Sequence, residues 1–503
     1  MGSMGWPRLH EVVALTVVLM FWSHAVTPSL ACKGQKNIVF IIIDDGGFES
    51  AAYNNTAIKT PHIDALGLRS TIFDHAFTTV SSCSPSRSAI MTGLPTHENG
   101  MYGLEHSTHH FHSFDQVQSL PLILSKHGYR TGLIGKKHVA PLSVYPYDYE
   151  RSEQVLGPAP MGLANLRNIT LMKEYAQEFL GGCKNDSRPI FLYFGFGDPH
   201  RCGGNKGEFC ELYGSGGEHG IIPDWTPVKY DPADVLVPYH VPDTPVARQD
   251  LANQYTSISR LDQGIGLMMK ELDSAGLTDD TLIMMFSDNG IPFPGAKTNL
   301  YERGMGEPMF VHNPKLQQKG LHSKALVSSV DMVPTALDWA NVHYPNYTIW
   351  SKKNVELQGR SLLPILEVVE PTEGFDAVFA SHQMHEVTMY YPMRVIRNKS
   401  YRLIYNIAHR LEYPIAGDLY SSPTYQDILS RNASGQSLHW YKTIDQYFNR
   451  PKWELFNLNN DPMELTNLAS DPAHADTLST MQAQLKAWQV ETNDPWLIKY
   501  THE

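Results

Sequence analysis

The chain has 503 residues, of which 42% are hydrophobic, 18% charged and 11% aromatic, as in ordinary globular proteins. This length allows two or more domains with a large buried core. The formal net charge of −12 argues against a nucleic-acid-binding protein. The 23 histidines would gain protons near about pH 5 and offset that charge, which suits an anionic substrate in an acidic compartment.

The N-terminus has the pattern of a secretory signal peptide. Arg8 precedes an apolar run over 12–22, which is too short to span a bilayer comfortably. Small residues favour cleavage after Ala25 or Ala31, so residues 1–31 are predicted to be the signal peptide. A membrane anchor is the alternative, although no later run is long and apolar enough to span a membrane.

Four apolar runs are predicted to be strands that end in polar residues and a glycine. They cover 37–43, 129–134, 190–196 and 282–286. A continuous apolar run of this kind is typical of a parallel strand buried on both faces. Because ligands bind at the carboxyl ends of such strands, the recurrence predicts one polar site at one sheet edge. Taken singly, each end is an ordinary turn signal. The polar residues that follow the strands are Asp44, Asp45, Lys136, His138, His200, Asp288 and Asn289.

The segment from Cys83 to Gly93 is predicted to be a loop that turns into a helix. Pro85 can begin the helix, and the free N–H groups of the first turn favour an anion in front of it. A buried cysteine at a helix start is the plain alternative. The whole string, Cys-Ser-Pro-Ser-Arg-Ser-Ala-Ile-Met-Thr-Gly, resembles the signature of the type I sulfatases at every fixed position.

The resemblance implies a fold class for the whole chain. Type I sulfatases have an α/β fold like that of alkaline phosphatase, with a large mixed, mostly parallel sheet between helices. A smaller C-terminal domain carries an antiparallel sheet and a helix. A composition shift near 367–374 places the boundary between a catalytic domain over 32–370 and a second domain over 371–503. Short strands are predicted in the second domain over 377–380, 401–405 and 453–458, followed by a closing helix.

The site residues offer the ligands of a hard divalent cation. Asp44, Asp45, Asp288 and Asn289 supply only oxygen atoms, which Ca²⁺ prefers, whereas Zn²⁺ prefers His and Cys. By resemblance to the family, one Ca²⁺ lies at these positions. The resemblance also implies that Cys83 is oxidised to formylglycine by a formylglycine-generating enzyme, and that the modified residue is both a metal ligand and the nucleophile.

Sulfate transfer needs cations and hydrogen-bond donors around the sulfate oxygens. The resemblance implies that one hydroxyl of the hydrated formylglycine attacks sulfur and that Arg87 helps to hold it. It implies that His200 or Lys297 protonates the leaving group. It further implies that His138 takes the proton whose loss releases sulfate. The candidate catalytic residues are Cys83, Arg87, Lys136, His138, His200 and Lys297.

Several further stretches resemble the sulfamidase branch of the family. They cover 44–50, 99–104, 198–203, 222–227, 288–294 and 385–389. Such enzymes cut the N–S bond of N-sulfated glucosamine at the non-reducing end of heparan sulfate. The resemblance implies a lysosomal homodimer reached through the secretory pathway, with no nucleic acid and no membrane span. Lys297 stands where that branch is expected to have an arginine, which keeps the charge and changes the donor geometry.

Two residues of the predicted second domain, His385 and Glu386, are candidates for substrate contacts or for support of the domain interface. A competing hypothesis for the activity is an O-sulfatase acting on sulfated glycans. The same fold would also accommodate a phosphatase or phosphonate hydrolase, and a catalytically dead glycan-binding protein is the hypothesis without enzyme activity.

Cysteine and asparagine positions suit a secreted chain. Cys202 and Cys210 flank a glycine-rich loop and are predicted to form a disulfide. Cys32 could leave with the signal peptide, and Cys183 has no assigned partner. Six Asn-x-Ser/Thr motifs are candidate glycan acceptors. They begin at Asn54, Asn168, Asn185, Asn346, Asn398 and Asn432.

Overall fold

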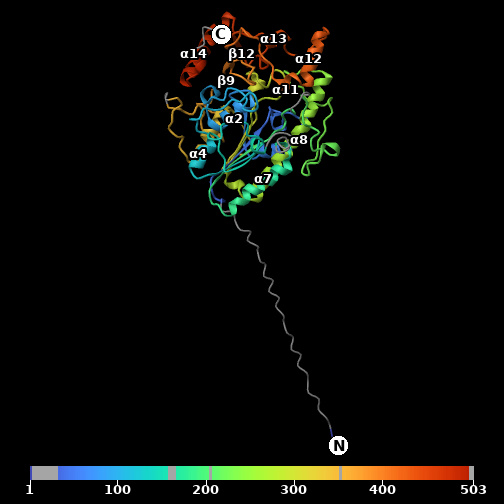
Figure 1. Ribbon diagram of the computed structural model, residues 1–503, viewed down its shortest axis with the longest axis vertical. Helices are drawn as coiled ribbons and strands as arrows, with labels where there is room; N and C mark the ends of the chain where they lie inside the picture. Colours follow the sequence, from blue (N-terminus) through green and yellow to red (C-terminus); the bar gives the residue numbers. More distant parts are fainter. Residues whose placement is uncertain (3–31, 157–165, 203–206, 351–353, 498–503) are drawn as a thin grey trace.

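The computed structural model describes residues 1–2, 32–156, 166–202, 207–350 and 354–497. An eight-stranded sheet forms the centre of its larger part (Figure 1). Its strand order is β4-β3-β5-β1-β6-β7-β2-β8. Neighbouring strands are parallel except where β7 pairs with β6 and with β2. The strands are β1 (Asn37–Ile43), β2 (Thr71–Phe77), β3 (Arg130–Gly135), β4 (Tyr149–Ser152), β5 (Ile190–Gly195), β6 (Thr281–Ser287), β7 (Met309–His312) and β8 (Leu321–Ser328).

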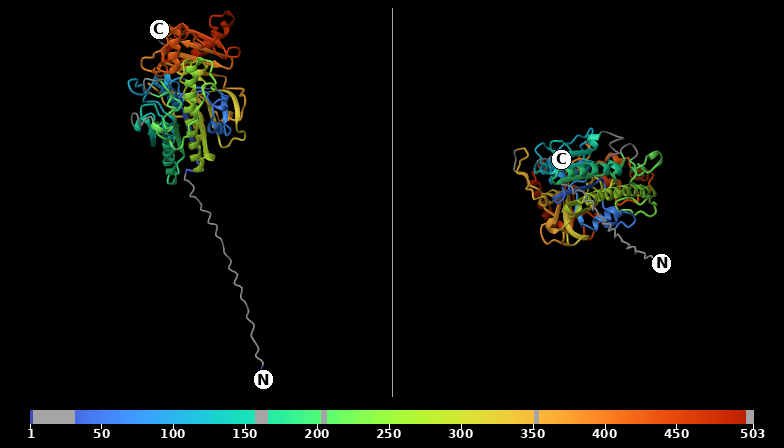
Figure 2. Two further views of the ribbon diagram at one scale, coloured as in Figure 1. Left: turned by 90° about the vertical axis from the view of Figure 1, so that its right-hand side faces the viewer. Right: turned by 90° about the horizontal axis from the view of Figure 1, so that it is seen from below.

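Helices cover both faces of this sheet, because its central strands are apolar on both sides. Phe40 belongs to the core that includes residues of α2 (Cys83–Thr92), α4 (Leu120–Lys126) and α10 (Met332–Ala340). The next residue, Ile41, belongs to the opposite core. That core includes residues of α1 (Pro61–Gly67), α7 (Ile169–Gly181) and α8 (Pro245–Ser274). Figure 2 shows the long α8 helix running along its face of the sheet.

A second sheet lies at the C-terminal end of the molecule (Figure 1). It is antiparallel, with strand order β12-β11-β10-β9. One face packs against α14 through Leu403, Leu485 and Trp488. The other face shares a core with Phe77 and Leu326 of the large sheet. Its elements are β9 (Ala377–His382), β10 (Met393–Asn398), β11 (Tyr401–Asn406), β12 (Trp453–Asn457) and α14 (Ala475–Glu491).

Further short α-helices lie in the described part of the chain. They are α3 (Thr96–Asn99), α5 (Glu153–Leu156), α9 (Glu302–Met305), α11 (Gly417–Tyr420), α12 (Pro423–Ala433) and α13 (Ile444–Phe448). Among the described helices, none is both long and apolar enough to cross a bilayer. The predicted signal peptide lies outside the described residues, apart from the first two.

The predicted fold class is confirmed, since a mixed, mostly parallel sheet is joined to a smaller antiparallel one. The four predicted strands of the large sheet match β1, β3, β5 and β6 to within one residue at each end. The sequence did not indicate β2, β4, β7, β8 or β10. The boundary at residue 370 stays a prediction.

The structure contains the predicted disulfide between Cys202 and Cys210. It also gives Cys183 the partner that the sequence left unassigned, because Cys183 is joined to Cys32. The expectation that Cys32 leaves with the signal peptide is therefore corrected: this cysteine belongs to the folded chain and lies buried just before β1. The bond connects the start of the central strand to the segment that follows α7.

Four of the six predicted glycan acceptors are exposed, namely Asn54, Asn185, Asn346 and Asn432. The other two are half-buried. The side-chain oxygen of Asn168 accepts a hydrogen bond at the start of α7, and that of Asn398 accepts two in the turn between β10 and β11. Glycosylation stays a prediction at all six.

His97 offers a test of how pH acts on this fold. Its Nδ1 lies 2.9 Å from Ser381 Oγ and its Nε2 lies 2.7 Å from Thr492 Oγ1, so it joins three distant segments. Burial outweighs the nearby Asp494 and lowers the pKa of His97 to about 3. The unfolded chain therefore binds more protons than the folded chain between that value and about 6.5. The stability that neutral His97 provides is complete above about pH 6.5 and is lost as the pH falls.

We expect His97→Gln to show a weaker pH dependence of stability than the wild type. Between about pH 7.5 and about pH 5, the wild-type free energy of unfolding should fall by about 2 kcal/mol more than that of the variant. Urea unfolding at both pH values measures this difference. The exposed His110 provides the control substitution, His110→Gln, which should behave as the wild type. Equal pH dependence of the wild type and His97→Gln would contradict the prediction.

Candidate active site

Cys83 is the first residue of α2, and all ten residues of this helix are buried. The helix ends at Gly93, whose φ of 70° lies in the left-handed region that favours glycine. The Sγ atom of Cys83 lies 3.8 Å from Asp45 Oδ1. Burial raises the pKa of the Cys83 thiol well above its usual value, so the unmodified residue is a neutral thiol and a poor nucleophile.

The ends of β1, β3, β5 and β6 meet in front of this helix, as the recurrence of polar strand ends predicted. Asp45 follows β1, and its backbone N–H donates a hydrogen bond of 3.0 Å to Asp288 Oδ1 after β6. The φ of Asp45 is 60°, a left-handed conformation that a non-glycine residue adopts at a cost. Asp198, after β5, pairs instead with Arg260 and holds the loop that carries His200.

Two cations bind the carboxylates on one side of the site. Arg87 Nε lies 2.9 Å from Asp288 Oδ2, and Arg87 Nη2 lies 3.4 Å from Asp44 Oδ1. Lys136 Nζ lies 2.7 Å from Asp44 Oδ2. Burial alone would raise the pKa of Asp44, but Lys136, His200 and Arg87 outweigh it and hold that pKa well below its usual range. Asp44 is therefore an anion under all ordinary conditions.

Lys297 lies on the opposite side of the site and is fully buried. Its Nζ lies 2.8 Å from Asp45 Oδ2, 3.1 Å from His200 Nε2 and 2.7 Å from Asp418 Oδ2. Burial alone would lower the pKa of Lys297, but Asp418 and Asp45 outweigh it and raise that pKa well above its usual value. Lys297 is a fixed positive charge. Asp418 was not found from the sequence, because it belongs to a short stretch without a motif.

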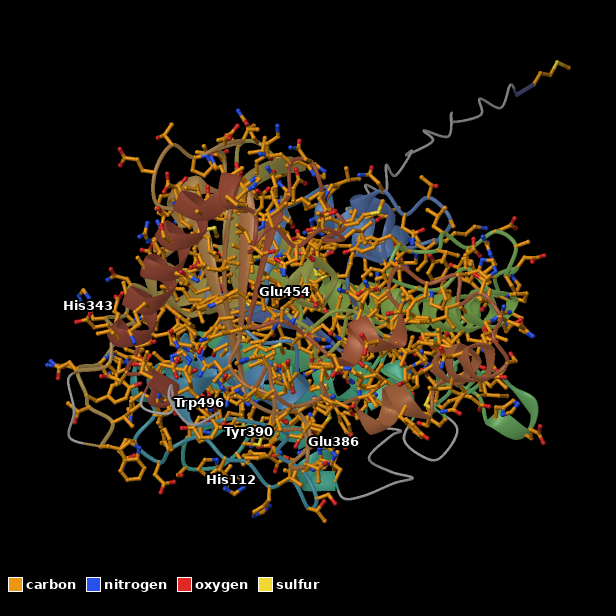
Figure 3. The ribbon with its side chains drawn as sticks, turned by 90° about the horizontal axis from the view of Figure 1, so that it is seen from above. His112, His343, Glu386, Tyr390, Glu454 and Trp496 are labelled. Atoms are coloured by element: carbon orange, nitrogen blue, oxygen red, sulfur yellow. A yellow bond between two sulfur atoms is a disulfide. The ribbon has the colours of Figure 1, made fainter. Side chains whose placement is uncertain are left out.

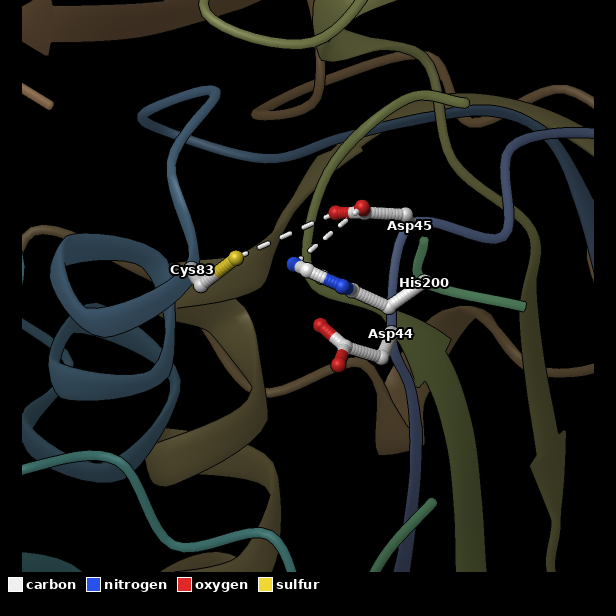
Figure 4. Close-up of side chains that lie close together, drawn as sticks. All are labelled: Asp44, Asp45, Cys83 and His200. Carbon is white, nitrogen blue, oxygen red and sulfur yellow. Dashed lines mark hydrogen bonds and ion pairs between the residues drawn. The ribbon is translucent and has the colours of Figure 1, made fainter. Parts of the chain in front are cut away.

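The site fits a divalent cation. One ligand atom from each of Asp44, Asp45, Cys83 and His200 lies within 4.8 Å of the others (Figure 4). Asn289 Nδ2 donates to Asp45 Oδ1 at 2.7 Å, while Asn289 Oδ1 is buried without a hydrogen-bond partner among the described residues. A buried carbonyl oxygen of this kind, beside several carboxylates, is what a Ca²⁺ ion would satisfy.

The predicted ligands are therefore brought together, and His200 lies within ligand distance of them. Burial raises the pKa of Asp288, and the neighbouring Asp44 and Asp45 raise it further against Arg87 and Lys136. A bound cation would relieve this crowding of negative charge.

His138 lies beside the cations and is held by its backbone. Its φ is 54°, and its N–H donates a hydrogen bond of 2.9 Å to Glu153, which also accepts from the N–H of Lys137. Its Nε2 lies 2.6 Å from Nδ1 of His106, an exposed residue. Burial, Lys136 and His106 lower the pKa of His138 well below its usual value, so its imidazole is neutral.

His106 and Glu153 are further site residues that were not predicted from the sequence. His106 opens a histidine-rich segment over 106–112, which was a usable signal. Glu153 has no such sequence signal, because its carboxylate holds the site through hydrogen bonds from the backbone N–H groups of Lys137 and His138.

The two candidate substrate contacts, His385 and Glu386, form hydrogen bonds to residues that neighbour the site residues. His385 is buried, and its Nδ1 lies 2.7 Å from Oγ of Ser82, the residue before Cys83. Glu386 is half-buried (Figure 3) and accepts a hydrogen bond of 2.7 Å from the N–H of Gly417. Through this bond Glu386 holds the first residue of α11, the helix that carries Asp418. These contacts fit support of the interface, and a role in substrate binding stays a prediction.

Comparisons with known proteins identify the family of the chain. The sequence model of the sulfatase family matches residues 36–342. The chain belongs to the sulfatase family. It is a hydrolase of that family, and residues 296–433 also match the model described as the C-terminal part of N-sulphoglucosamine sulphohydrolase.

Two sulfatases illustrate the range of similarity. The chain is 52% identical over 473 residues to N-sulphoglucosamine sulphohydrolase of Homo sapiens, covering 93% of this chain and 92% of that protein. It is 22% identical over 546 residues to N-acetylglucosamine-6-O-sulfatase of Bacteroides thetaiotaomicron, covering 92% and 88%.

Solved structures share the fold of this sulfatase. A protein in complex with its substrate D-glucosamine-2-N,6-O-disulfate has a TM-score of 0.62 at 19% identity, covering 92% of this chain and 99% of that one. The phosphonate monoester hydrolase of Agrobacterium radiobacter has a TM-score of 0.61 at 18% identity, covering 91% and 96%. At these identities the likeness concerns the fold alone.

Proposed function

We propose that this sulfatase is an N-sulfoglucosamine sulfohydrolase. It removes the sulfate group from the nitrogen of N-sulfated glucosamine at the non-reducing end of heparan sulfate. The observation that carries the proposal is the 52% identity to the human enzyme of that name, which extends over 93% of the chain and includes its C-terminal part. The site around Cys83 supplies the groups that such a reaction requires.

In this proposal Cys83 is converted to formylglycine, whose hydrate supplies a hydroxyl nucleophile at the N-terminus of α2. Asp44, Asp45, Asp288 and Asn289 hold one Ca²⁺, which would add positive charge beside the sulfate oxygens. The chain's own cations, Arg87, Lys136 and Lys297, surround the same space and stabilise the negative charge that develops on those oxygens.

Three residues of the chain are suited to proton transfer around position 83. His138 is neutral and therefore able to accept a proton from a hydroxyl at that position. His200 Nε2 and Lys297 Nζ, which lie 3.1 Å apart, place a proton beside the nitrogen that leaves. Burial and Lys297 lower the pKa of His200, so a proton on its ring is readily given away. Arg87, Lys136, His138 and Lys297 are buried, which limits the contact of these groups with bulk water.

Sulfate release from N-sulfoglucosamine at about pH 5 tests the proposal, in enzyme produced together with the formylglycine-generating enzyme. Mass spectrometry of the peptide that contains Cys83 establishes its modification in the same sample. Formylglycine together with N-sulfate release is the expected result. Formylglycine with release only from an O-sulfated sugar would replace the substrate assignment by that of an O-sulfatase. An unmodified cysteine without turnover would favour a glycan-binding protein.

The O-sulfatase hypothesis has one specific observation in its favour. Lys297 stands where the sulfamidase branch is expected to have arginine, and lysine is the more usual residue in other sulfatases. The fully buried ammonium of Lys297 contacts two carboxylates and a histidine, so it keeps the charge of an arginine with a more compact donor. The sulfamidase proposal therefore requires that this substitution keep N-sulfate activity.

We also propose the cellular setting that goes with this activity. The enzyme enters the secretory pathway through its signal peptide, carries glycans at exposed acceptor asparagines and works in the lysosome as a homodimer. The signal-like N-terminus, the two disulfides and the exposed sequence motifs support this proposal.

A further inference from the structure

A carboxylate from the C-terminal part of the chain reaches the far side of the site. Asp418 Oδ2 lies 2.7 Å from Lys297 Nζ and 3.9 Å from His200 Nε2. The side chain of Asp418 keeps 19% of its surface exposed, whereas that of Lys297 is completely buried. Asp418 is therefore a partly exposed carboxylate beside His200 and Lys297, the two groups that the proposed function places next to the leaving nitrogen.

This carboxylate is held in position by its own helix. The N–H of Gly417 donates a hydrogen bond of 2.7 Å to Glu386, and Leu419 is fully buried in a small core with Met389 and Ala416. The residues on both sides of Asp418 are thus anchored in the C-terminal part of the chain. A carboxylate that is fixed in this way is pre-organised for binding a cation.

The ammonium of Lys297 contacts two carboxylates, Asp45 at 2.8 Å and Asp418 at 2.7 Å, and Asp45 is also a ligand of the proposed Ca²⁺. Asp418 pairs with Lys297 through Oδ2, while its Oδ1 accepts a hydrogen bond of 2.8 Å from the N–H of Leu419. Burial alone would raise the pKa of Asp418, but Lys297, His200 and His385 outweigh it and hold that pKa below its usual range. The contact of 2.7 Å with the Lys297 ammonium is that of a carboxylate in an ion pair, and the oxygens of Asp418 have capacity for a further donor.

The leaving atom distinguishes a sulfamate from a sulfate ester. When the N–S bond breaks, the sulfuryl group passes to the attacking hydroxyl oxygen and the bonding electron pair stays on nitrogen. The nitrogen takes one proton from the site to become an amine and, in acid, a second from water to become an ammonium group. The oxygen of an ester takes one proton and leaves as a neutral alcohol. A carboxylate beside the leaving atom forms an ion pair with the ammonium product of the sulfamate. It has no such interaction with the neutral alcohol that leaves from an ester.

We propose that Asp418 is a specificity-determining residue that favours an amine leaving group over an alcohol. This inference rests on the proposed function, because it takes N-sulfated glucosamine as the substrate. It adds a role for the C-terminal part of the chain, which supplies the charge that recognises the nitrogen, while the large sheet supplies the groups that act on sulfur.

Inhibition by glucosamine and glucose tests the inference directly, since the two sugars differ only in the amino group. At about pH 5 the wild type should bind glucosamine about tenfold more tightly than glucose. Asp418→Asn should lose this preference and should lower kcat/KM for N-sulfoglucosamine by about tenfold or more. Asp418→Glu should retain part of the preference. Asp427→Asn, on the neighbouring α12, is the matched control and should leave both unchanged.

Each other outcome has a defined meaning. A wild type that releases N-sulfate but binds glucosamine and glucose equally would overturn the inference and leave the proposed function intact, even if Asp418→Asn does not fold. If a folded Asp418→Asn protein binds glucosamine and glucose more weakly by the same factor, the role of Asp418 is merely structural and the inference is overturned. A wild type that releases no N-sulfate would overturn the proposed function itself.

Discussion

Replacement of Cys83 by alanine is expected to abolish sulfate release, with a loss in kcat of at least about 10⁴-fold. The side chain at position 83 meets Asp45 at the centre of the site, and alanine can neither be oxidised nor attack sulfur. The measurement is sulfate release from N-sulfoglucosamine under saturating conditions, compared with the wild type.

The same variant should fold normally, because alanine leaves only a small volume unfilled in a buried position. A thermal unfolding midpoint within a few degrees of the wild type is the control. Ser84→Ala is a matched substitution at the next residue, and it should retain most of the activity. Substantial turnover by a folded Cys83→Ala protein would rule out position 83 as the source of the nucleophile.

Under the proposed function, a chelator that removes Ca²⁺ should lower activity by about 10³-fold, because the buried carboxylates then lack the charge that balances them and the sulfate lacks a cation. Asn289→Ala provides the sharpest variant. Asn289 Oδ1 has no hydrogen-bond partner among the described residues. Its loss should therefore reduce the affinity for the metal more than it reduces the stability of the metal-free protein. We expect its affinity for Ca²⁺ to fall by about 10 to 100-fold.

A rise in the unfolding midpoint on adding Ca²⁺ provides a readout that does not depend on activity. The wild type should show it at low concentrations, and Asn289→Ala only at higher ones. Asn460→Ala, at an exposed position in the turn after β12, is the control for the change of residue type. Full activity in protein shown to be metal-free would contradict a role for the ion.

The sequence predicted the parts of the fold that are apolar and continuous. β1, β3, β5 and β6 are runs buried on both faces, so hydrophobicity alone located them. β2 contains Asp74 and His75 at a shift in register, and β8 is an edge strand with an exposed Lys324. Such mixed strands depend on their neighbours for their structure, and a single sequence does not reveal those neighbours.

The same distinction applies to the site. The residues of the four strand ends were predicted because parallel strands bring their carboxyl ends to one edge. Asp418 was missed because its contact with Lys297 joins residues 121 positions apart and depends on how the second sheet packs on the first. Cys183 lacked an assigned partner for a similar reason, since its bond to Cys32 spans 151 residues.

The complete burial of α2 has a consequence for the order of events during synthesis. In the folded protein β1 lies between β5 and β6, and α2 packs against α10. The strands β5 and β6 and the helix α10 all leave the ribosome long after Cys83. Until residues 332–340 have emerged, the segment around Cys83 lacks its final cover and stays accessible. An enzyme that modifies Cys83 must therefore act on the growing or unfolded chain. Under the proposed conversion of Cys83, a chain that folds before it meets the modifying enzyme keeps its thiol, so the yield of active enzyme depends on the rate of modification relative to the rate of folding.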